Sequence, residues 1–349
     1  MKKILFLVFL ISSNCLLSQV KDDIDKFVLK QLEDQKITGI SIGVIKNGKV
    51  IKTTGYGMAN LEQNIPATEN SVFKLASVSK QFISTAIMKL KEDGKLKLTD
   101  TIGMYFKDAP ANWNKITIRH LLNHSSGLER ESPAFDFFEI KADSVLIRAA
   151  YKDPLVFATG TKWQYCNLGY FMLADIIRIV SGVPFPKFMR EEIFIKNGMS
   201  NTNTTSASNL VPLRAGGYVR AGHDSIMNAQ DGIALRPSGA FISTITDLMK
   251  WEILMQENRF LSQGDWQKMW TDTVSTGSKD LTEYYGYGWT TRQYKNKQIV
   301  LHTGSLPGFR TIFFRCPADK TAIIVLTNSD HANPTTIAQG VADILYKDK

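Results

Sequence analysis

Between residues 73 and 82 the chain reads Phe73-Lys-Leu-Ala-Ser77-Val-Ser-Lys80-Gln-Phe82. Apolar residues then recur at helical spacing, and Gly94 follows them as a stop signal, so a helix is predicted to open at Ser77. Ser77 and Lys80 are three residues apart, which makes them neighbours on the surface of that helix. Lys80 lies beside apolar positions, where desolvation favours the neutral amine. Because a neutral amine can take the proton of an adjacent hydroxyl, the pair is predicted to be a nucleophile and its base.

The Ser-x-x-Lys pattern is weak on its own, because the chain holds a second copy, Ser71-Val-Phe-Lys74. That copy falls in an extended run, where residues three apart point to opposite faces. It is therefore interpreted as structural. For Ser77 the alternative is a helix N-cap serine followed by a solvated lysine.

Two further patterns support the catalytic reading. Tyr165-Cys166-Asn167 lies on a loop just before a predicted helix that starts near Leu168, and His302-Thr303-Gly304-Ser305 closes a short β-rich run. Tyr294-Lys-Asn296 copies the first pattern, but in what reads as a hairpin turn. The order Ser-x-x-Lys, Tyr-x-Asn, His-x-Gly, each in its helix, loop and strand context, is hard to obtain by accident.

Strand signals occur at both ends of the chain. Asn47-Gly48 separates the β-rich runs 40–45 and 50–54 and predicts a hairpin. Further β-rich runs precede a helix-like tail over 335–345: Tyr285–Thr291, Gln298–His302, Thr311–Cys316 and Thr321–Thr327. We predict an α/β fold in which N- and C-terminal strands form one antiparallel sheet flanked by helices. A mainly helical subdomain, about 99–238, is inserted into it, with a cleft between the two parts.

These motifs resemble the serine beta-lactamase family, which includes class C enzymes, D-alanyl-D-alanine peptidase-like hydrolases, carboxylesterases and D-stereospecific peptidases. Tyr-x-Asn is typical of the class C branch. Other stretches that look like landmarks of the family are Ile118-Arg-His-Leu-Leu-Asn-His-Ser-Ser-Gly-Leu128, Pro237-Ser-Gly-Ala-Phe-Ile-Ser-Thr244, Tyr285-Gly-Tyr-Gly-Trp289 and His302-Thr-Gly-Ser-Leu-Pro-Gly-Phe309. The resemblance covers about residues 22–346 and implies a beta-lactamase/transpeptidase-like fold.

Carried onto this sequence, the resemblance implies catalytic roles that chemistry also supports. Ser77 would attack a carbonyl, and Lys80 together with Tyr165 would carry the proton from the nucleophile to the leaving group. The backbone N–H groups of Ser77 and Ser305 would form an oxyanion hole. No metal and no cofactor is expected.

The resemblance also implies substrate-binding residues, namely Asn167, His302, Thr303, Gly304 and Ser305. Asn167 would hold an amide or ester side chain of the substrate and keep Lys80 in place. His302 stands where many relatives have lysine, near Tyr165 and the leaving group. As a titrating group, it is expected to give the site a pH response near neutrality.

The expected activity is that of an exported serine hydrolase that cleaves D-amino-acid peptides or carboxylic esters. His-Thr-Gly favours these over beta-lactams, because efficient class C beta-lactamases mostly have Lys-Thr-Gly. Three alternatives stay open: a class C-like beta-lactamase, a penicillin-binding sensor that acylates without turnover, and an inactive interaction protein. By the same resemblance, class A beta-lactamases need a Glu in a Glu-x-x-x-Asn-type segment for deacylation. Glu192 and Asn197 are one residue too far apart to form it, so class A is excluded.

Composition bounds the expected partners. The chain has 349 residues, 44% of them hydrophobic, with 42 Lys and Arg against 33 Asp and Glu. Its positive residues are scattered, so a small-molecule or peptide substrate is expected, such as a cell-wall peptide or a beta-lactam, and no nucleic acid. Cys166 and Cys316 leave a disulfide open. His120 and His124 lack the neighbouring Glu of a zinc-protease helix, so they are interpreted as structural.

The N-terminus predicts export. Lys2 and Lys3 precede an apolar stretch, and residues 1–18 resemble a signal peptide, which leaves 19–349 as the hydrolase domain. The stretch is shorter than the roughly 20 residues that span a bilayer, so no stable membrane span is expected. The expected location is periplasmic or secreted. Lipidation at Cys15 is the weaker alternative.

Overall fold

The computed structural model describes residues 19, 22–136, 139, 141–205, 209–222, 225–230, 241–279 and 282–347. The predicted signal peptide and Cys15 lie outside the described residues. So do residues 237–240 of one of the stretches that look like landmarks of the family.

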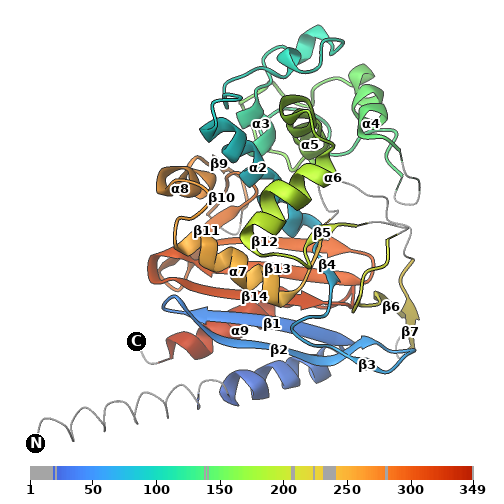
Figure 1. Ribbon diagram of the computed structural model, residues 1–349, viewed down its shortest axis with the longest axis vertical. Helices are drawn as coiled ribbons and strands as arrows, with labels where there is room; N and C mark the ends of the chain where they lie inside the picture. Colours follow the sequence, from blue (N-terminus) through green and yellow to red (C-terminus); the bar gives the residue numbers. More distant parts are fainter. Residues whose placement is uncertain are drawn as a thin grey trace, which may run out of the picture.

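A nine-stranded antiparallel sheet forms the base of the molecule, in the order β3-β2-β1-β14-β13-β12-β11-β10-β9 (Figure 1). β1 pairs with β14, with Ile40 opposite Thr327, so strands from the two ends of the chain share one sheet as predicted. The strands are β1 Gly39–Lys46, β2 Lys49–Asn60, β3 Ile65–Pro66, β9 Val274–Ser275, β10 Glu283–Tyr285, β11 Thr290–Tyr294, β12 Lys297–Leu306, β13 Phe309–Cys316 and β14 Thr321–Thr327.

Two turns show how the sequence sets this sheet. Asn47 and Gly48 have φ of 51° and 77° between β1 and β2, as the predicted Asn-Gly hairpin requires. The continuous strand predicted over Tyr285–Thr291 is wrong, because the chain turns between β10 and β11. In that turn the Gly286 N–H donates to the Trp289 carbonyl at 2.8 Å, and Gly288 has φ of 77°. Both turns place glycine at a positive φ, which glycine adopts without strain because it has no Cβ.

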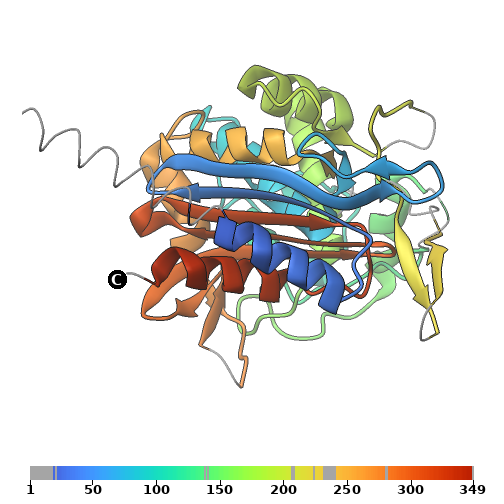
Figure 2. The same ribbon diagram turned by 90° about the horizontal axis from the view of Figure 1, so that it is seen from below.

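Helices cover both faces of the sheet. A helix over residues 22–34 and α9 (Pro334–Tyr346) lie side by side on one face (Figure 2). They enclose an apolar layer that includes Val28, Ile42 and Val341, all fully buried. The opposite face carries α7 (Ile245–Gln256). Because β1 is covered from both sides, nearly all of its residues are buried.

The other helices gather above the sheet in Figure 1. They are α2 Lys80–Glu92, α3 Ile118–Leu122, α4 Asp143–Ala149, α5 Asn167–Ser181, α6 Phe185–Phe188 and α8 Gln263–Thr271. Short 3-10 or π turns connect the elements: η1 Ala76–Ser79, η2 Ile102–Met104, η3 Ala111–Trp113, η4 Ala150–Lys152, η5 Met189–Phe194, η6 Ile195–Asn197 and η7 Pro317–Asp319. The bounds of the inserted subdomain stay a prediction.

No single helix among the described residues has the length and apolarity needed to cross a membrane. Only the pair Asn167–Ser181 and Phe185–Asn197, bent by 79°, passes that test, by length and composition alone. Cys166 and Cys316 are both buried and free, so the disulfide that the sequence left open is not formed.

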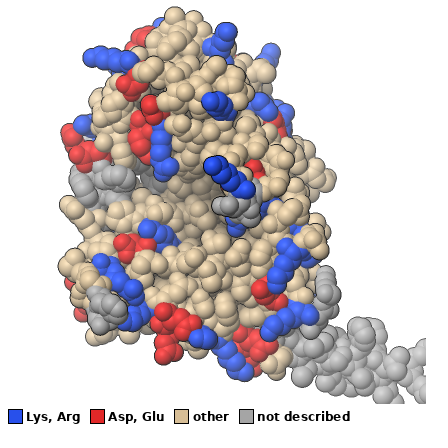
Figure 3. Space-filling model, turned by 180° about the vertical axis from the view of Figure 1, so that it is seen from behind, with Lys and Arg blue, Asp and Glu red and all other residues tan. Residues whose placement is uncertain are grey.

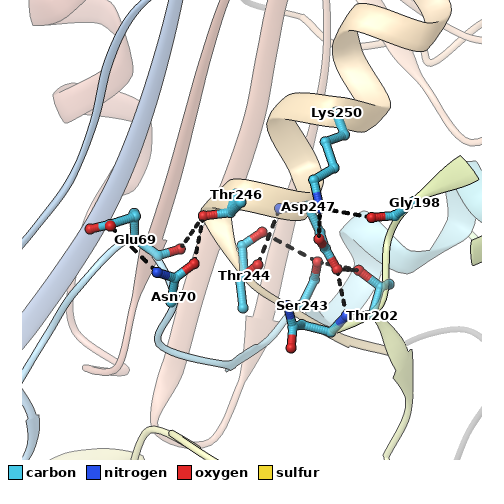
Figure 4. A network of polar contacts seen from close by, with 10 residues as sticks. Glu69, Asn70, Gly198, Thr202, Ser243, Thr244, Thr246, Asp247 and Lys250 are labelled. Carbon is cyan, nitrogen blue, oxygen red and sulfur yellow. Dashed lines mark hydrogen bonds and ion pairs between the residues drawn. The ribbon is translucent and has the colours of Figure 1, made fainter. Parts of the chain in front are cut away.

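A small sheet anchors the chain just before Ser77. Its strands are β4 (Phe73–Lys74), β8 (Phe241–Ser243) and β5 (Asn203–Thr204), in the order β4-β8-β5, and β6 (Tyr218–Ala221) pairs separately with β7 (Ser225–Asn228). Asp247, at the start of α7, ties this sheet to its surroundings (Figure 4). Its carboxylate accepts from the Asn201 N–H at 2.7 Å, the Thr202 hydroxyl at 3.1 Å and Lys250 at 2.9 Å.

Replacing Asp247 with alanine is expected to lower the free energy of unfolding by about 3 kcal/mol, because it removes the buried carboxylate that accepts from the Asn201 N–H and the Thr202 hydroxyl. Asp247 is fully buried and Thr202 is 1% exposed. Urea denaturation checks the value. Thr246→Ala is the control on the same helix: its hydroxyl donates to Asn70 near the surface, and we expect a loss of about 1 kcal/mol or less. Equal losses in the two variants would contradict the role given to Asp247.

Candidate active site

Ser77 lies in η1, immediately before α2, and is half-buried. The preceding residue, Ala76, has φ of 51°, a conformation that residues with a Cβ rarely adopt. Hydrogen bonds to β8 hold this turn: the Leu75 N–H donates to the Phe241 carbonyl at 2.9 Å, and the Phe241 N–H donates to Ser79 Oγ at 3.2 Å. The nucleophile candidate is therefore fixed by strand contacts as well as by the helix.

β12 passes very close to the same turn. A Cβ on Gly304 would lie 2.3 Å from the Leu75 carbonyl oxygen and 2.2 Å from Thr311 Oγ1, so only glycine fits there. The Thr311 hydroxyl itself donates to the Leu75 carbonyl at 2.9 Å. Ser305, the next residue, is exposed. Gly304 thus brings the backbone of β12 alongside Ser77.

Lys80 is fully buried, and its Nζ lies 3.3 Å from Ser77 Oγ. The ammonium donates to Asn167 Oδ1 at 2.7 Å. Burial lowers the pKa of Lys80 to about 7, with the Glu131 carboxylate opposing this shift and Arg130 adding to it. As the sequence predicted, this lysine can therefore lose its proton near neutral pH and accept one from Ser77.

Tyr165 stands on the loop before α5, with Lys80 Nζ 4.7 Å from the centre of its ring. Its hydroxyl is buried and has no hydrogen-bond partner among the described residues. That burial raises the pKa of Tyr165, and the nearby Ser77 hydroxyl opposes the shift. His124 supports the loop from behind: its ring centre is 4.4 Å from that of Tyr165, and its Nδ1 accepts from the Cys166 N–H at 3.2 Å. The result is a neutral phenol beside Ser77 and Lys80.

Asn167 is the first residue of α5, which Cys166 caps by accepting from the Gly169 N–H. The side-chain amide of Asn167 bridges two charged groups. Its Oδ1 accepts from Lys80, and its Nδ2 donates to Glu131 Oε1 at 2.6 Å. Sequence reasoning missed Glu131, which follows the stretch ending at Leu128 by three residues. The stretch over residues 118–128 was the only sequence signal near Glu131, and it ends before that residue.

His302 does not behave as predicted. It is 5% exposed, its Nδ1–H donates to the Thr303 carbonyl at 2.7 Å, and its Nε2 accepts from the Tyr285 hydroxyl at 2.9 Å. Burial, together with the nearby charge of Lys80, lowers the pKa of His302 to about 3. The expected pH response near neutrality from His302 is therefore wrong, and Lys80 is the group with a pKa in that range.

A pocket of about 260 Å³ opens beside His302, Thr303 and Tyr165. It forms where β11 begins: Thr290, the first residue of β11, pairs with Leu301, whereas β12 continues to Leu306 with β13 as its partner. The remaining lining residues are Trp163, Glu283, Tyr285, Thr290, Arg292, Leu301 and Thr335. The edge of β12 beyond Leu301 is thus available to a substrate laid alongside it.

The sequence patterns that were not assigned to the active site have structural roles. Ser71 lies before β4, where its Oγ accepts from the Thr68 N–H at 2.9 Å. Tyr294-Lys-Asn296 forms a hairpin turn, with φ of 45° at Lys295 and 63° at Asn296. His120 closes a capping box at the start of α3. On the face shown in Figure 3, basic and acidic side chains are interspersed.

A sequence model of the family described as Beta-lactamase matches residues 24–346 of the chain. Penicillin-binding protein 4* of Bacillus subtilis (strain 168) is 27% identical over 305 residues, which are 82% of this chain. The chain spans 67% of that relative's length and 63% of the length of another curated relative.

Solved structures with a similar fold include a penicillin-binding protein homologue and a D-amino acid amidase. The octameric penicillin-binding protein homologue from Pyrococcus abyssi has a TM-score of 0.86 and 26% identity, over 93% of this chain and 77% of that one. D-amino acid amidase from Ochrobactrum anthropi SV3 has a TM-score of 0.83 over 94% of this chain and 100% of that one. With 22% identity, this second likeness concerns the fold alone.

Proposed function

The chain belongs to the beta-lactamase family of serine hydrolases, and on this premise we propose that it cleaves D-aminoacyl amides and peptides through an acyl-enzyme on Ser77. The observation that carries the proposal is the fully buried Lys80, which lies 3.3 Å from Ser77 Oγ and has a pKa of about 7. A base with that pKa is active at neutral pH. Carboxylic esters are the second substrate class.

The reaction we propose has two halves. Neutral Lys80 takes the Ser77 proton as Oγ attacks the carbonyl carbon, and the N–H groups of Ser77 and Ser305 stabilise the resulting oxyanion. Tyr165 then gives its hydroxyl proton to the leaving nitrogen or oxygen as the bond to the carbonyl carbon breaks, and it recovers a proton from Lys80. Water attacks the acyl-enzyme in the second half, and its proton returns through Tyr165 and Lys80 to Ser77 Oγ.

The pocket beside β12 favours uncharged leaving groups. A lysine in place of His302 would offer a positive charge to an anionic substrate such as a beta-lactam, whereas the buried His302 is neutral, with a pKa of about 3. Arg292 also lines this pocket but is paired with Glu283 at 3.7 Å. Amides and esters without a carboxylate near the leaving group therefore fit this site better than beta-lactams do. Thr303, whose carbonyl accepts from His302, would line the path of the leaving group.

Export is part of the same proposal. It rests on residues 1–18, where Lys2 and Lys3 precede the apolar stretch 4–11. Cleavage of this segment would release residues 19–349 to the periplasm or the medium, where D-amino-acid compounds of the cell wall are present.

Treatment with a fluorophosphonate is expected to add one adduct per chain, and mass spectrometry of the digest should place it on the peptide that contains Ser77. Protein unfolded in urea is the control and should stay unlabelled, because the depressed pKa of Lys80 depends on burial. An adduct on another serine, or none in the folded protein, would overturn the proposal.

A substrate panel separates the alternatives on the same protein. D-Alanine p-nitroanilide, p-nitrophenyl butyrate and nitrocefin should be hydrolysed in that order of kcat/KM. Fastest turnover of nitrocefin would indicate a class C-like beta-lactamase. Stoichiometric labelling by a fluorescent penicillin without steady-state product would indicate a sensor instead.

A further inference from the structure

The Glu131 carboxylate is only partly used by the protein. Its Oε1 accepts from Asn167 Nδ2 at 2.6 Å, whereas its Oε2 is buried and has no hydrogen-bond partner among the described residues. The Arg130 guanidinium approaches Oε1 only to 3.6 Å, and its side chain is 61% exposed. An ionised carboxylate can accept about four hydrogen bonds, and leaving a buried acceptor unpaired is costly. This oxygen therefore has unused capacity to bind a donor.

Glu131 belongs to the contacts around the nucleophile. Contacts run from Ser77 to Lys80, from Lys80 to Asn167 and from Asn167 to Glu131, at 3.3, 2.7 and 2.6 Å. The carboxylate thus lies on the Asn167 side of the site. Neither Asn167 nor Glu131 lines the pocket beside His302. The two ends of a substrate that crosses Ser77 would therefore meet different surroundings.

The charge balance on the Asn167 side favours a cation. Above pH 7 Lys80 loses its charge, because burial lowers its pKa to about 7. The Arg130 guanidinium lies over the Tyr165 ring, 5.3 Å from its centre, and its side chain is largely exposed. A small ammonium group could approach the carboxylate more closely than this guanidinium does. Charge-assisted hydrogen bonds of that kind are stronger than neutral ones.

We propose that Glu131 binds the free α-ammonium group of the D-aminoacyl part of the substrate, next to Asn167. The inference rests on the proposed function and narrows it. A substrate with a free amino group would be preferred over its N-acylated counterpart, which offers an amide N–H without positive charge. The protein is then a D-aminoacyl hydrolase, in contrast to enzymes that act on N-acylated cell-wall stems or on penicillins with an acylamino side chain.

The test compares D-alanine p-nitroanilide with N-acetyl-D-alanine p-nitroanilide on the wild type, Glu131→Gln and Glu129→Gln. Glutamine keeps an acceptor for Asn167 Nδ2 but removes the charge. In Glu131→Gln, kcat/KM for the free amine should fall about 10- to 100-fold, mainly through KM, and change less than about threefold for the acetylated substrate. Glu129→Gln removes the same charge two residues away and should change neither value by more than about twofold.

Equal losses on both substrates would show that Glu131 only positions Asn167 and Lys80, and would overturn the proposal. If Glu131→Gln fails to fold, the wild type alone still tests the proposal. A higher kcat/KM for the acetylated substrate than for the free amine would also overturn it. Fluorophosphonate labelling separates this failure from that of the acyl-enzyme. A protein labelled at Ser77 without preference for the free amine refutes the Glu131 subsite alone, and an unlabelled one refutes the proposed function.

Discussion

Replacement of Lys80 with methionine is expected to lower kcat/KM for D-alanine p-nitroanilide about 1,000- to 10,000-fold. Methionine has nearly the same length and suits the buried position, but it cannot take the proton of Ser77. Without that base the hydroxyl is a poor nucleophile at neutral pH. Steady-state kinetics of the purified variant measure the loss, and fluorophosphonate labelling should slow in parallel.

Lys89→Met is the matched control on the same helix. Lys89 is 34% exposed and pairs with Asp93 at 2.6 Å, far from the chemistry, so its activity should stay within about twofold of the wild type. Lys80→Met should be at least as stable as the wild type in urea, because a buried amine is replaced by an apolar side chain. Full activity in a folded Lys80→Met protein would remove Lys80 from the mechanism.

The pH profile gives the same prediction a second readout. Because the pKa of Lys80 is lowered to about 7, the base form exists above that pH. Wild-type kcat/KM should therefore rise with pH through a midpoint near 7 and fall as Lys80 becomes protonated in acid. The residual activity of Lys80→Met should lack this step. His302 stays neutral through this range, since its pKa is about 3.

Local patterns predicted the fold where the residues themselves set the conformation. Asn47-Gly48 made the hairpin, and the strands at the two ends of the chain met in one sheet. Local sequence also distinguished the two Ser-x-x-Lys copies, because Ser71 lies in an extended run and Ser77 at the start of a helix. The strand predicted over 285–291 is interrupted by a turn, in which the Tyr287 N–H donates to the Met269 carbonyl of α8 at 2.7 Å, a contact that only the folded chain reveals.

The burial of Lys80 in the candidate site could be predicted from the sequence, but the environments of His302 and Glu131 could not. Lys80 lies beside the apolar stripe of the helix that it begins, so its burial could be inferred from spacing. His302 lies within β12, and its pKa is lowered by burial and by the charge of Lys80, which is more than 200 residues away in the sequence. Glu131 acts through Asn167, thirty-six residues away. Partners at such separations leave no mark in the local sequence, because a pKa depends on burial and neighbouring charge together.

Replacement of Tyr165 with phenylalanine is expected to reduce kcat about 100- to 1,000-fold. The ring would keep its place against His124 and Lys80, so the variant removes only the buried hydroxyl that has no partner among the described residues. That hydroxyl is the only donor that we assign to the leaving group. A nitroanilide, whose leaving nitrogen needs a proton, should therefore lose more activity than p-nitrophenyl butyrate, whose leaving group departs as a stabilised anion.

Tyr170→Phe is the control within the same aromatic cluster. The Tyr170 hydroxyl donates to the Leu122 carbonyl at 2.9 Å and lies 3.2 Å from Ser84 Oγ, so its loss should lower stability more than activity. Comparison of the two variants separates proton transfer from packing, because both rings border Lys80, at 4.7 Å and 5.3 Å. Equal losses on the amide and the ester in Tyr165→Phe would argue against proton donation to the leaving group and leave Tyr165 as support for Lys80. A larger loss on the amide links the buried phenol directly to cleavage of the carbon–nitrogen bond.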